Sequence, residues 1–473
     1  MRISLISAAV LAFAIASPTL AAPAADKSRE GEAAFRGLYK ELVETNTTLS
    51  AGSCTLAAER MAARLKAAGY ADDAVHVFST PEHPKDGGLV AVLKGSDASA
   101  KAILLLAHID VVEAKREDWV RDPFTLIEEG GYFYARGSSD DKAMAAIFTD
   151  LLVRYKQEGF KPKRDIKLAL TCGEETSGAF NGASYLSTQH KDWIDAEFAI
   201  NEGAGGRFDA NGKWVILNIQ AAEKVYQDFA VETTNPGGHS SQPVPSNAIY
   251  QMADALKKVE GYEFPVMLND ATRAYFTRYG KVLGGETGAA MEAIVKDPND
   301  KAAEAVLNKD KLWHSMLRTT CVATMIEGGH AKNALAQRVT TNVNCRVFPG
   351  VPVDSVRDKL AEVIGDPAVT VKVKEPRSIA TATPAMPESV LKPIEAISAK
   401  MYPGVPVIPF MSTGATDGIY TTAAGIPTYG FSAIFGDPDG GNIHGLNERV
   451  GVKALMDGRA FQYLLIKAYA NQK

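Results

Sequence analysis

The stretch that decides the fold is Ile103-Leu104-Leu105-Leu106-Ala107-His108-Ile109-Asp110, an apolar run that ends on an imidazole and a carboxylate. Short apolar runs bounded by turn residues are typical of strands. Three other runs share this character: Leu89–Leu93, Ile166–Leu170 and Phe198–Ile200. Helical apolar spacing runs from Leu56 to Leu65 and from Met144 to Tyr155. Helix and strand thus alternate from about residue 26 to residue 222, which predicts an α/β layer, a mostly parallel sheet covered by helices.

The segment from residue 225 to about residue 375 has a different order of elements. We predict a strand, a helix, an irregular helical insert, two strands, a helix and a strand, at 226–232, 246–259, 271–317, 319–326, 338–347, 353–363 and 369–373. The regular elements follow the β-α-β-β-α-β order of a ferredoxin-like unit. We therefore expect a ferredoxin-like α+β domain at 225–375, inserted into a catalytic domain made of 26–224 and 376–473 that ends on a helix at Lys453–Ala470.

Length and composition fit a multidomain globular protein. A chain of 473 residues is long enough for two or three domains, each with its own core. Hydrophobic residues make up 46% and charged residues 23%, which excludes wholesale disorder and a coiled-coil rod. The net charge is −5, from 51 Lys+Arg and 56 Asp+Glu, and no basic block stands out. We therefore expect no nucleic-acid partner.

The first residues predict export. Arg2 precedes a mostly apolar run from Ile3 to Ala16, and small residues follow as far as Ala22. This pattern indicates a signal peptide at 1–21 with cleavage near Ala21. A transmembrane anchor is the alternative, although the run is shorter than the ~20 residues that span a bilayer. Because no later run reaches ~18 apolar residues, we expect a periplasmic or secreted protein without membrane contact after cleavage.

The four cysteines need an interpretation in such an oxidising compartment. Cys321 and Cys345 lie at nearly equal distances on either side of a predicted turn at 328–337, as cross-strand neighbours would. A disulfide between these two and a pair of buried free thiols both fit this pattern. Cys54 and Cys172 have no such relation.

Acidic and imidazole side chains stand where the strands of an open α/β sheet end, which is the edge that forms its ligand crevice. The candidates are His108-Ile109-Asp110 after 103–107, Asp140-Asp141-Lys142 at a helix start, Glu174-Glu175 after 166–171, Asn201-Glu202-Gly203 after 198–200, and His444 beyond the inserted domain. In an extended segment, residues i and i+2 point the same way, so Asp110 can orient the His108 ring while its other nitrogen binds metal. Two imidazoles and three carboxylates form a ligand set that zinc accepts, and a carboxylate shared by two ions is typical of a two-metal hydrolytic site.

The order His-x-Asp, Asp-Asp-Lys, Glu-Glu, Asn-Glu-Gly and a distant His resembles the dizinc metallopeptidase family of aminoacylase, succinyl-diaminopimelate desuccinylase, glutamate carboxypeptidase and carboxypeptidase S. The resemblance covers nearly the whole mature chain. It implies two Zn²⁺ per subunit, His108, Asp140 and Glu202 holding one, and Asp140, Glu175 and His444 holding the other. Co²⁺ or Mn²⁺ could occupy the same N/O set. The resemblance also makes Asp140 the bridge and Glu174 the general base, places Asp110 behind a ligand, and implies a cis peptide bond between Asp140 and Asp141.

The inserted domain resembles the family's lid or dimerisation domain. Its segment Pro236–Ser241 matches a loop whose histidine, here His239, reaches the partner's active site in dimeric members and supports the oxyanion. Two further segments match substrate-contacting stretches, which makes Asn333 and Arg346 candidates for binding the substrate carboxylate, Arg through its bidentate fork. A turn-stabilising Asn and a surface-strand Arg are the alternatives. The resemblance implies a homodimer formed through this domain.

Two segments, 117–124 and 317–320, together with the helical insert, look most similar to the carboxypeptidase S and secreted N-acyl amino acid hydrolase branch. Asn201 departs from relatives that often have Asp before the ligand Glu. Loops such as 412–417, with Gly414 and Thr416, and the helical insert would shape the substrate pocket. That shape decides between dipeptides, longer peptides and N-acyl amino acids.

The implied reaction is hydrolysis of an amide whose leaving amine belongs to an amino acid with a free α-carboxylate. Glu174 would take a proton from a water whose pKa the metals lower towards about 7, and would return it to the leaving nitrogen. His239 would stabilise the oxyanion. A dizinc aminopeptidase of the related clan is one alternative, which the inserted domain disfavours, and a non-catalytic peptide-binding relative is another. We find no Gly-x-Ser-x-Gly elbow, so a serine hydrolase is not expected.

Overall fold

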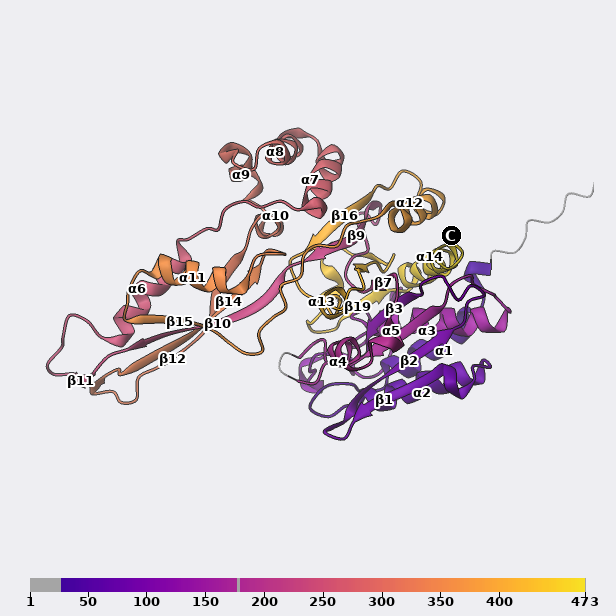
Figure 1. The fold of residues 1–473 in the computed structure, drawn as a ribbon, viewed down its shortest axis with the longest axis horizontal. Coiled ribbons are helices and arrows are strands. Elements are labelled where there is room, and N and C mark those ends of the chain that lie inside the picture. Colours follow the sequence, from indigo (N-terminus) through magenta and orange to yellow (C-terminus); the bar gives the residue numbers. More distant parts are fainter. Residues whose placement is uncertain (1–26, 177–178, 473) are drawn as a thin grey trace, which may run out of the picture.

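The structure is a computed structural model that describes residues 27–176 and 179–472. Figure 1 shows a large sheet flanked by helices and, beside it, a narrower arm built on a second sheet. The predicted fold class, an α/β unit with an inserted ferredoxin-like unit, is confirmed.

Ten strands form the large sheet, in the order β1-β2-β6-β3-β7-β17-β9-β8-β18, with β16 paired to β9. The strands are β1 (Val75–Thr80), β2 (His83–Leu93), β3 (Ile103–His108), β6 (Ile166–Thr171), β7 (Phe198–Asn201), β8 (Gly206–Phe208), β9 (Trp214–Glu223), β16 (Val407–Ser412), β17 (Thr428–Gly430) and β18 (Phe435–Gly436). The central pairs β6–β3, β3–β7 and β7–β17 are parallel, and antiparallel pairs occur towards both edges. The sheet is thus parallel where β3, β6 and β7 end side by side. β2 begins before the predicted run at Leu89 because its first half pairs with β1 alone, at the sheet edge.

Helices cover both faces of this sheet. One face carries α1 (Glu32–Val43), α2 (Cys54–Ala67), α3 (Lys142–Gln157), α12 (Glu388–Met401) and α14 (Val452–Ala470), and the other carries α4 (Gly182–Gln189), α5 (Lys191–Ile194) and α13 (Gly418–Ala423). In β3, Ile103 and Leu105 pack into the first core, and Leu104 and Leu106 pack into the second. Because successive side chains of a strand point to opposite faces, this double burial explains the unbroken apolar run.

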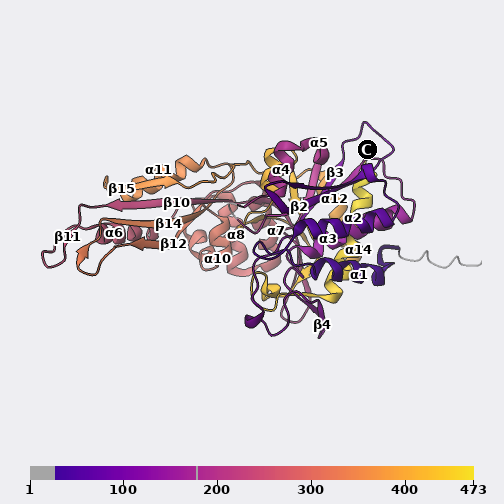
Figure 2. The same cartoon turned by 90° about the horizontal axis from the view of Figure 1, so that it is seen from below.

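The arm is a four-stranded antiparallel sheet in the order β12-β14-β10-β15. Its elements are β10 (Val225–Thr234), α6 (Ala248–Glu260), β12 (Thr320–Gly328), β14 (Arg338–Val347), α11 (Val353–Ile364) and β15 (Val369–Val373). The two helices pack against the sheet through one shared core. A small two-stranded antiparallel sheet of β11 (Gly238–His239) and β13 (Ala334–Leu335) lies at the end of the arm that points away from the large sheet (Figures 1 and 2).

The helical insert packs on the large sheet instead of on the arm. It consists of α7 (Asp270–Leu283), α8 (Gly285–Lys296), α9 (Lys301–Leu307) and α10 (Lys311–Met316). Tyr275, Phe276 and Met291 share a core with Ile408 and Met411 of β16. The insert therefore covers the part of the large sheet where the chain enters the arm.

A small third sheet, β19-β5-β4, completes the catalytic unit. Its strands are β4 (Ile127–Glu129), β5 (Tyr132–Tyr134) and β19 (Arg449–Gly451), and short 3-10 turns occur at Lys27–Arg29, Asp72–Ala74, Arg116–Asp118 and Gly440–Asn442. The predicted signal peptide at 1–21 lies outside the described residues. Within 27–176 and 179–472, no helix combines the length and the apolar character that a membrane crossing needs.

Both cysteine pairs are disulfides in this structure. Cys321 and Cys345 face each other on β12 and β14, so of the two alternatives that the sequence left open the structure has the disulfide. The Cys54–Cys172 disulfide was not predicted, because the two residues are 118 positions apart in the sequence. It joins the first residue of α2 to the residue that follows β6, directly before Gly173 and Glu174.

The lengths of the closed loops predict how much each disulfide stabilises the fold. Removal of Cys54–Cys172 by a double Cys→Ser change should lower the free energy of unfolding by about 5 kcal/mol, against about 3.5 kcal/mol for Cys321–Cys345, because the longer loop loses more chain entropy when closed. Chemical denaturation of the two double variants under oxidising conditions measures the difference. Equal stabilities of the wild type and the 54/172 variant would contradict this expectation.

Candidate metal and active site

The carboxylate of Asp140 lies between two imidazole rings. Its Oδ1 is 3.1 Å from Nε2 of His108, and its Oδ2 is 3.1 Å from Nε2 of His444. On the first side, Glu202 Oε1 lies 3.6 Å from the same His108 nitrogen. On the second side, Glu175 Oε2 lies 2.9 Å from the His444 nitrogen. The structure therefore brings all five residues together, three on each side with Asp140 common to both.

Glu174 joins this cluster from the end of β6. Ligand atoms of His108, Glu174 and Glu202 all lie within 4.8 Å of one another, as do those of His108, Asp140 and Glu175. These two overlapping triplets have the size of metal-binding groups.

Asp110 holds two parts of the cluster in place. Its carboxylate accepts hydrogen bonds from the backbone N–H groups of Glu174 and Glu175, at 3.4 and 3.1 Å. The same carboxylate is 3.5 Å from Nδ1 of His108, and the Asp110 carbonyl oxygen is 3.1 Å from that nitrogen. Nδ1 is thereby engaged by one residue, which leaves Nε2 to face Asp140 and Glu202.

Negative charge dominates the electrostatics of the cluster. Burial alone would lower the pKa of His108, yet Glu202 and the other surrounding carboxylates raise it well above the ordinary value. Hydrogen bonds to Asp140 and Glu175 raise the pKa of His444 to about 10. Burial, and then the charge of Glu202, raise the pKa of Glu174 well above its usual range. So much buried negative charge favours a bound cation.

Local backbone geometry supports this placement. The peptide bond between Asp140 and Asp141 is cis, as the family resemblance implied. The loop that carries His444 runs through the left-handed region at Gly440, Gly441, Asn442 and His444, with φ between 58° and 76°. A Cβ on Gly441 would lie 2.7 Å from the carbonyl oxygen of Arg449, so this position requires glycine.

A buried ion pair that the sequence analysis did not identify anchors the Asp140 loop. Arg136 donates to Glu448 Oε2 at 2.8 Å, and both side chains are buried. Glu448 Oε1 accepts the backbone N–H groups of Ser139 and Asp140, at 2.8 and 3.1 Å. Because Glu448 lies four positions after His444, it links the two segments that supply the bridging carboxylate and the second imidazole. In the sequence, the signal that could have identified Glu448 is its acidic side chain only four positions after His444.

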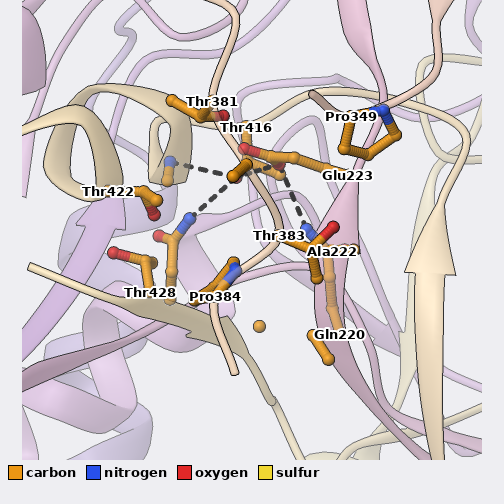
Figure 3. A pocket seen from close by; sticks show the side chains of 15 residues that line it. Gln220, Ala222, Glu223, Pro349, Thr381, Thr383, Pro384, Thr416, Thr422 and Thr428 are labelled. Carbon is orange, nitrogen blue, oxygen red and sulfur yellow. Dashed lines mark hydrogen bonds between the residues drawn. The ribbon is translucent and has the colours of Figure 1, made fainter. Parts of the chain in front are cut away.

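Two further acids lie behind the cluster and were also missed as individual residues. Figure 3 shows Glu223, at the end of β9, beside a cavity of only about 20 Å³; Thr416 donates to it at 2.8 Å and Gln220 at 3.2 Å. Burial raises the pKa of Glu223 to about 8. Asp417 accepts from Thr171 at 2.9 Å and from Asn181 at 2.7 Å. Asp417 therefore joins the ends of the β6 and β16 segments directly behind Glu174.

Comparison with known proteins gives a consistent result. The model of "Peptidase family M20/M25/M40" matches residues 104–468. The chain belongs to this family. The human N-fatty-acyl-amino acid synthase/hydrolase PM20D1 is 26% identical over 383 residues, which are 79% of this chain and 75% of that protein. A Dictyostelium discoideum protein named "Probable carboxypeptidase S-like 2" is 27% identical over 394 residues, 80% of this chain and 74% of that one.

A solved structure shows the same fold. The M20 family metallo-carboxypeptidase Sso-CP2 from Sulfolobus solfataricus superposes with a TM-score of 0.69 at 18% identity, over 92% of this chain and 99% of that one. The M20 chain is thus a hydrolase of the metallopeptidase and amidohydrolase type. The resemblance to this family stated from the motifs is confirmed.

The predicted substrate-contacting residues of the M20 chain are spread more widely than the cluster. Arg346 lies on β14 with its guanidinium 4.7 Å from the centre of the Tyr226 ring. Burial lowers its pKa, and the charge of Glu174 is among those that oppose this effect, so the two side chains are within electrostatic reach. His239 and Asn333 are exposed at the two-stranded β11–β13 sheet at the end of the arm, away from the large sheet (Figure 1). This chain does not bring these two residues to its own cluster.

The two predicted residues of the 412–417 loop have internal partners. The Gly414 N–H donates to Ser412 Oγ at 3.1 Å. The Thr416 hydroxyl donates to Glu223 and accepts from Asn201 at 3.1 Å. In this structure Thr416 therefore connects two residues of the protein behind the cluster.

The Glu448 arrangement predicts a large effect of a small change. Glu448→Gln removes the charge that neutralises buried Arg136, so the free energy of unfolding should fall by about 3–5 kcal/mol, and divalent metal content should fall with it. Glu128→Gln is a matched control, since its pair with Arg36 is exposed and should contribute at most about 1 kcal/mol. Urea denaturation and elemental analysis measure both quantities. Wild-type stability of the Glu448→Gln protein would contradict the assigned anchoring role.

Proposed function

We propose that the protein is an exported dizinc hydrolase that cleaves an amide bond and releases an amino acid with a free α-carboxylate. The observation that carries this proposal is the position of Asp140, with one oxygen towards His108 and the other towards His444. A carboxylate in that position can be shared by two cations, as two-metal hydrolytic sites require. Carboxypeptidase, dipeptidase and N-acyl amino acid amidohydrolase activities all fit this reaction.

The residues present suit a pair of zinc ions. His108, Asp140 and Glu202 would hold one ion, and Asp140, Glu175 and His444 would hold the other. Glu202 Oε1 is buried and makes no hydrogen bond in the structure, so its lone pairs are available to a cation. Nitrogen and oxygen donors of this kind suit Zn²⁺, and Co²⁺ or Mn²⁺ could take the same places. When bound, such ions lower the pKa of a water and polarise the substrate carbonyl.

Glu174 is proposed as the residue that moves the proton. Its backbone is fixed by Asp110, and its carboxylate lies beside His108 and Glu202 but belongs to neither of the two proposed ligand sets that share Asp140. One carboxylate oxygen would accept a proton from the attacking water. The same oxygen would then donate that proton to the nitrogen of the leaving amino acid.

The substrate carboxylate would bind to Arg346, whose planar guanidinium can donate two parallel hydrogen bonds. Asn333 and His239, at the far end of the arm, would act on the cluster of a second subunit. Their distance from the cluster of their own chain in Figure 1 supports a dimer. In such a dimer, His239 would donate to the oxyanion that forms in the other site.

The edge strand β12 is the proposed dimer contact. Residues 322–328 of this strand are exposed, and β12 pairs with β14 on one side only within the described chain. Val322, Met325 and Ile326 are 60–61% exposed. An exposed apolar edge strand is a ready site for pairing with another chain, so a second copy could extend the sheet here.

Export is supported by two observations of different kinds. The pattern at 1–21 is typical of a signal peptide, and the chain has two disulfides, which persist in oxidising compartments. The proposed location is therefore the periplasm or the extracellular space.

Glu174→Gln tests the proposed chemistry. The variant should keep its fold and two divalent ions per chain but lose about 10²–10⁴-fold in kcat, because an amide cannot accept the proton of the attacking water. Thermal unfolding and metal analysis provide the controls. An active, metal-loaded Glu174→Gln protein would remove this residue from the mechanism.

The same assay separates the proposed function from an aminopeptidase. Blocking the amino terminus of a test dipeptide should preserve cleavage, and amidating its carboxyl terminus should abolish it. The opposite result, with a free amine required and a free carboxylate dispensable, would favour the aminopeptidase alternative.

Subunit mixing tests the dimer and the role of His239 together. His239→Ala and Glu174→Gln proteins should each be inactive, whereas equal mixing after dissociation should restore about a quarter of wild-type activity, since half the dimers carry one intact site. Ile326→Lys should give monomers in light scattering, with Val120→Lys, an exposed residue outside the arm, as its control. Full activity of monomeric Ile326→Lys would exclude a contribution from a partner.

A further inference from the structure

The small cavity beside Glu223 lies where the chain enters and leaves the arm. Its volume is about 20 Å³, more than the ~10–15 Å³ that one water molecule needs. β9 ends at Glu223, and after one further residue the chain enters the arm on β10. The segment that returns from the arm contributes residues 381–384, and Figure 3 shows Thr383 and Pro384 across the same space from Glu223. The mechanism proposed above does not use this cavity.

The polar groups that line the cavity are rich in oxygen. Side-chain oxygens come from Asn201, Gln220, Glu223 and the threonines at 381, 383, 416, 422 and 428. The other described lining residues are Ala, Gly and Pro. The described lining therefore holds one acid and no basic side chain.

Hydrogen bonds fix how the two amide side chains of the lining are oriented. Glu223 accepts from the Thr416 hydroxyl at 2.8 Å and from Gln220 Nε2 at 3.2 Å. Because Thr416 donates its only hydroxyl hydrogen to Glu223, Asn201 has to present its Nδ2 to Thr416, at 3.1 Å. The amide nitrogens are thus used by this network, and the amide oxygens are not.

The oxygens of these two amides are buried without a partner. Asn201 and Gln220 are only 1% and 5% exposed, and neither Asn201 Oδ1 nor Gln220 Oε1 accepts a hydrogen bond. A buried carbonyl oxygen without a partner is unfavourable, so these atoms favour a ligand that accepts their lone pairs. A water molecule and a cation both meet this requirement.

The charge of Glu223 distinguishes the water molecule from the cation. Burial raises the pKa of Glu223 to about 8, and the charges that act most strongly on it are those of Glu202 and Asp417, which have the same sign. A water molecule would leave this carboxylate without an opposite charge. A cation would neutralise it and would also bind the two amide oxygens.

We propose that this cavity binds one monovalent cation of about the size of K⁺, held by oxygens of Glu223, Asn201 and Gln220. Carbonyl-type oxygens are the groups that replace the hydration shell of K⁺ in selective sites. Ca²⁺ sites usually have several carboxylates, whereas one carboxylate balances a single positive charge.

The bound ion connects the returning segment to the large sheet. Residues 381–384 lie on one side of it, and the ends of β7 and β9 lie on the other. The site shares no residue with the two proposed zinc ligand sets, although Asn201 directly precedes Glu202. The ion therefore stabilises the junction of the arm with the catalytic unit and does not depend on the proposed reaction.

Exchange of the salt tests this inference on the full-length, metal-loaded protein. At about pH 8.5, above the pKa of Glu223, the midpoint of thermal unfolding should be at least about 2 °C higher in about 100 mM KCl than in the same concentration of choline chloride. Choline keeps the ionic strength equal but is too large for a cavity of about 20 Å³. Equal midpoints in the two salts would overturn the proposal and indicate a water molecule instead.

Glu223→Gln tests the role of the carboxylate. The change keeps the size of the side chain but removes its charge, so the difference between the two salts should fall to less than about half. Gln220→Met removes one of the unpartnered oxygens and should act in the same direction. Glu128→Gln, an exposed acid outside the cavity, is the control and should keep the full difference. An undiminished KCl effect in folded Glu223→Gln and Gln220→Met proteins would refute the assigned ligands.

Crystals grown with Tl⁺, a K⁺ analogue that scatters anomalously, locate the ion directly. The wild type should show an anomalous peak between Glu223 and Asn201, and Glu223→Gln should show none. A wild-type crystal without a peak in this cavity would contradict the proposal. Neither the salt experiment nor the crystals need turnover, so the cation site can fail while the proposed hydrolase function holds, and the reverse.

Discussion

The carboxylate of Asp140 has to face His108 and His444 at the same time, and much of the catalytic unit is organised around this requirement. Several carboxylates lie within a few ångströms of one another, and they repel strongly because little water screens them. Hydrogen bonds from backbone N–H groups hold the acids in position: Glu448 fixes the loop of Asp140, and Asp110 fixes the loop of Glu174. A pair of cations would offset the remaining repulsion.

The three surroundings of the cluster differ in a way that suits the proposed reaction. Towards the arm lies Arg346, a cation that can receive a carboxylate. Away from the arm lies a cavity of about 650 Å³ whose lining includes Asp140, Asp141 and Glu202. Behind the cluster, Asp417 and Glu223 bind hydroxyl and amide groups of the protein itself.

Sequence patterns confined to a few neighbouring residues predicted the strands and helices well. The run at 103–107 predicted β3 because a strand buried on both faces must be apolar at every position. The 3.6-residue apolar spacing at 144–155 predicted α3 because residues at that spacing lie on one face of a helix. The β-α-β-β-α-β order of the arm was also predicted correctly, because each of its elements has its own local apolar periodicity. Several relations between distant segments were not predicted. The Cys54–Cys172 disulfide, the packing of the helical insert on β16, and the anchoring of the Asp140 loop by Glu448 all depend on residues that are neighbours only in the folded chain.

By itself, the sequence determined the element types, the class of fold, and the set of acids and imidazoles that end the strands, because each is governed by local burial periodicity and by position relative to a strand end. Only the tertiary structure decided that Thr416 binds Glu223, that Glu448 anchors the loop of Asp140, and that a cavity free of arm residues opens beside Glu202. The family resemblance had already implied that Asp140 is shared and that His239 acts on a partner's site. The physical reason is that distances between atoms depend on how the sheets and the arm pack together. Packing is a property of the whole chain, which no short segment contains.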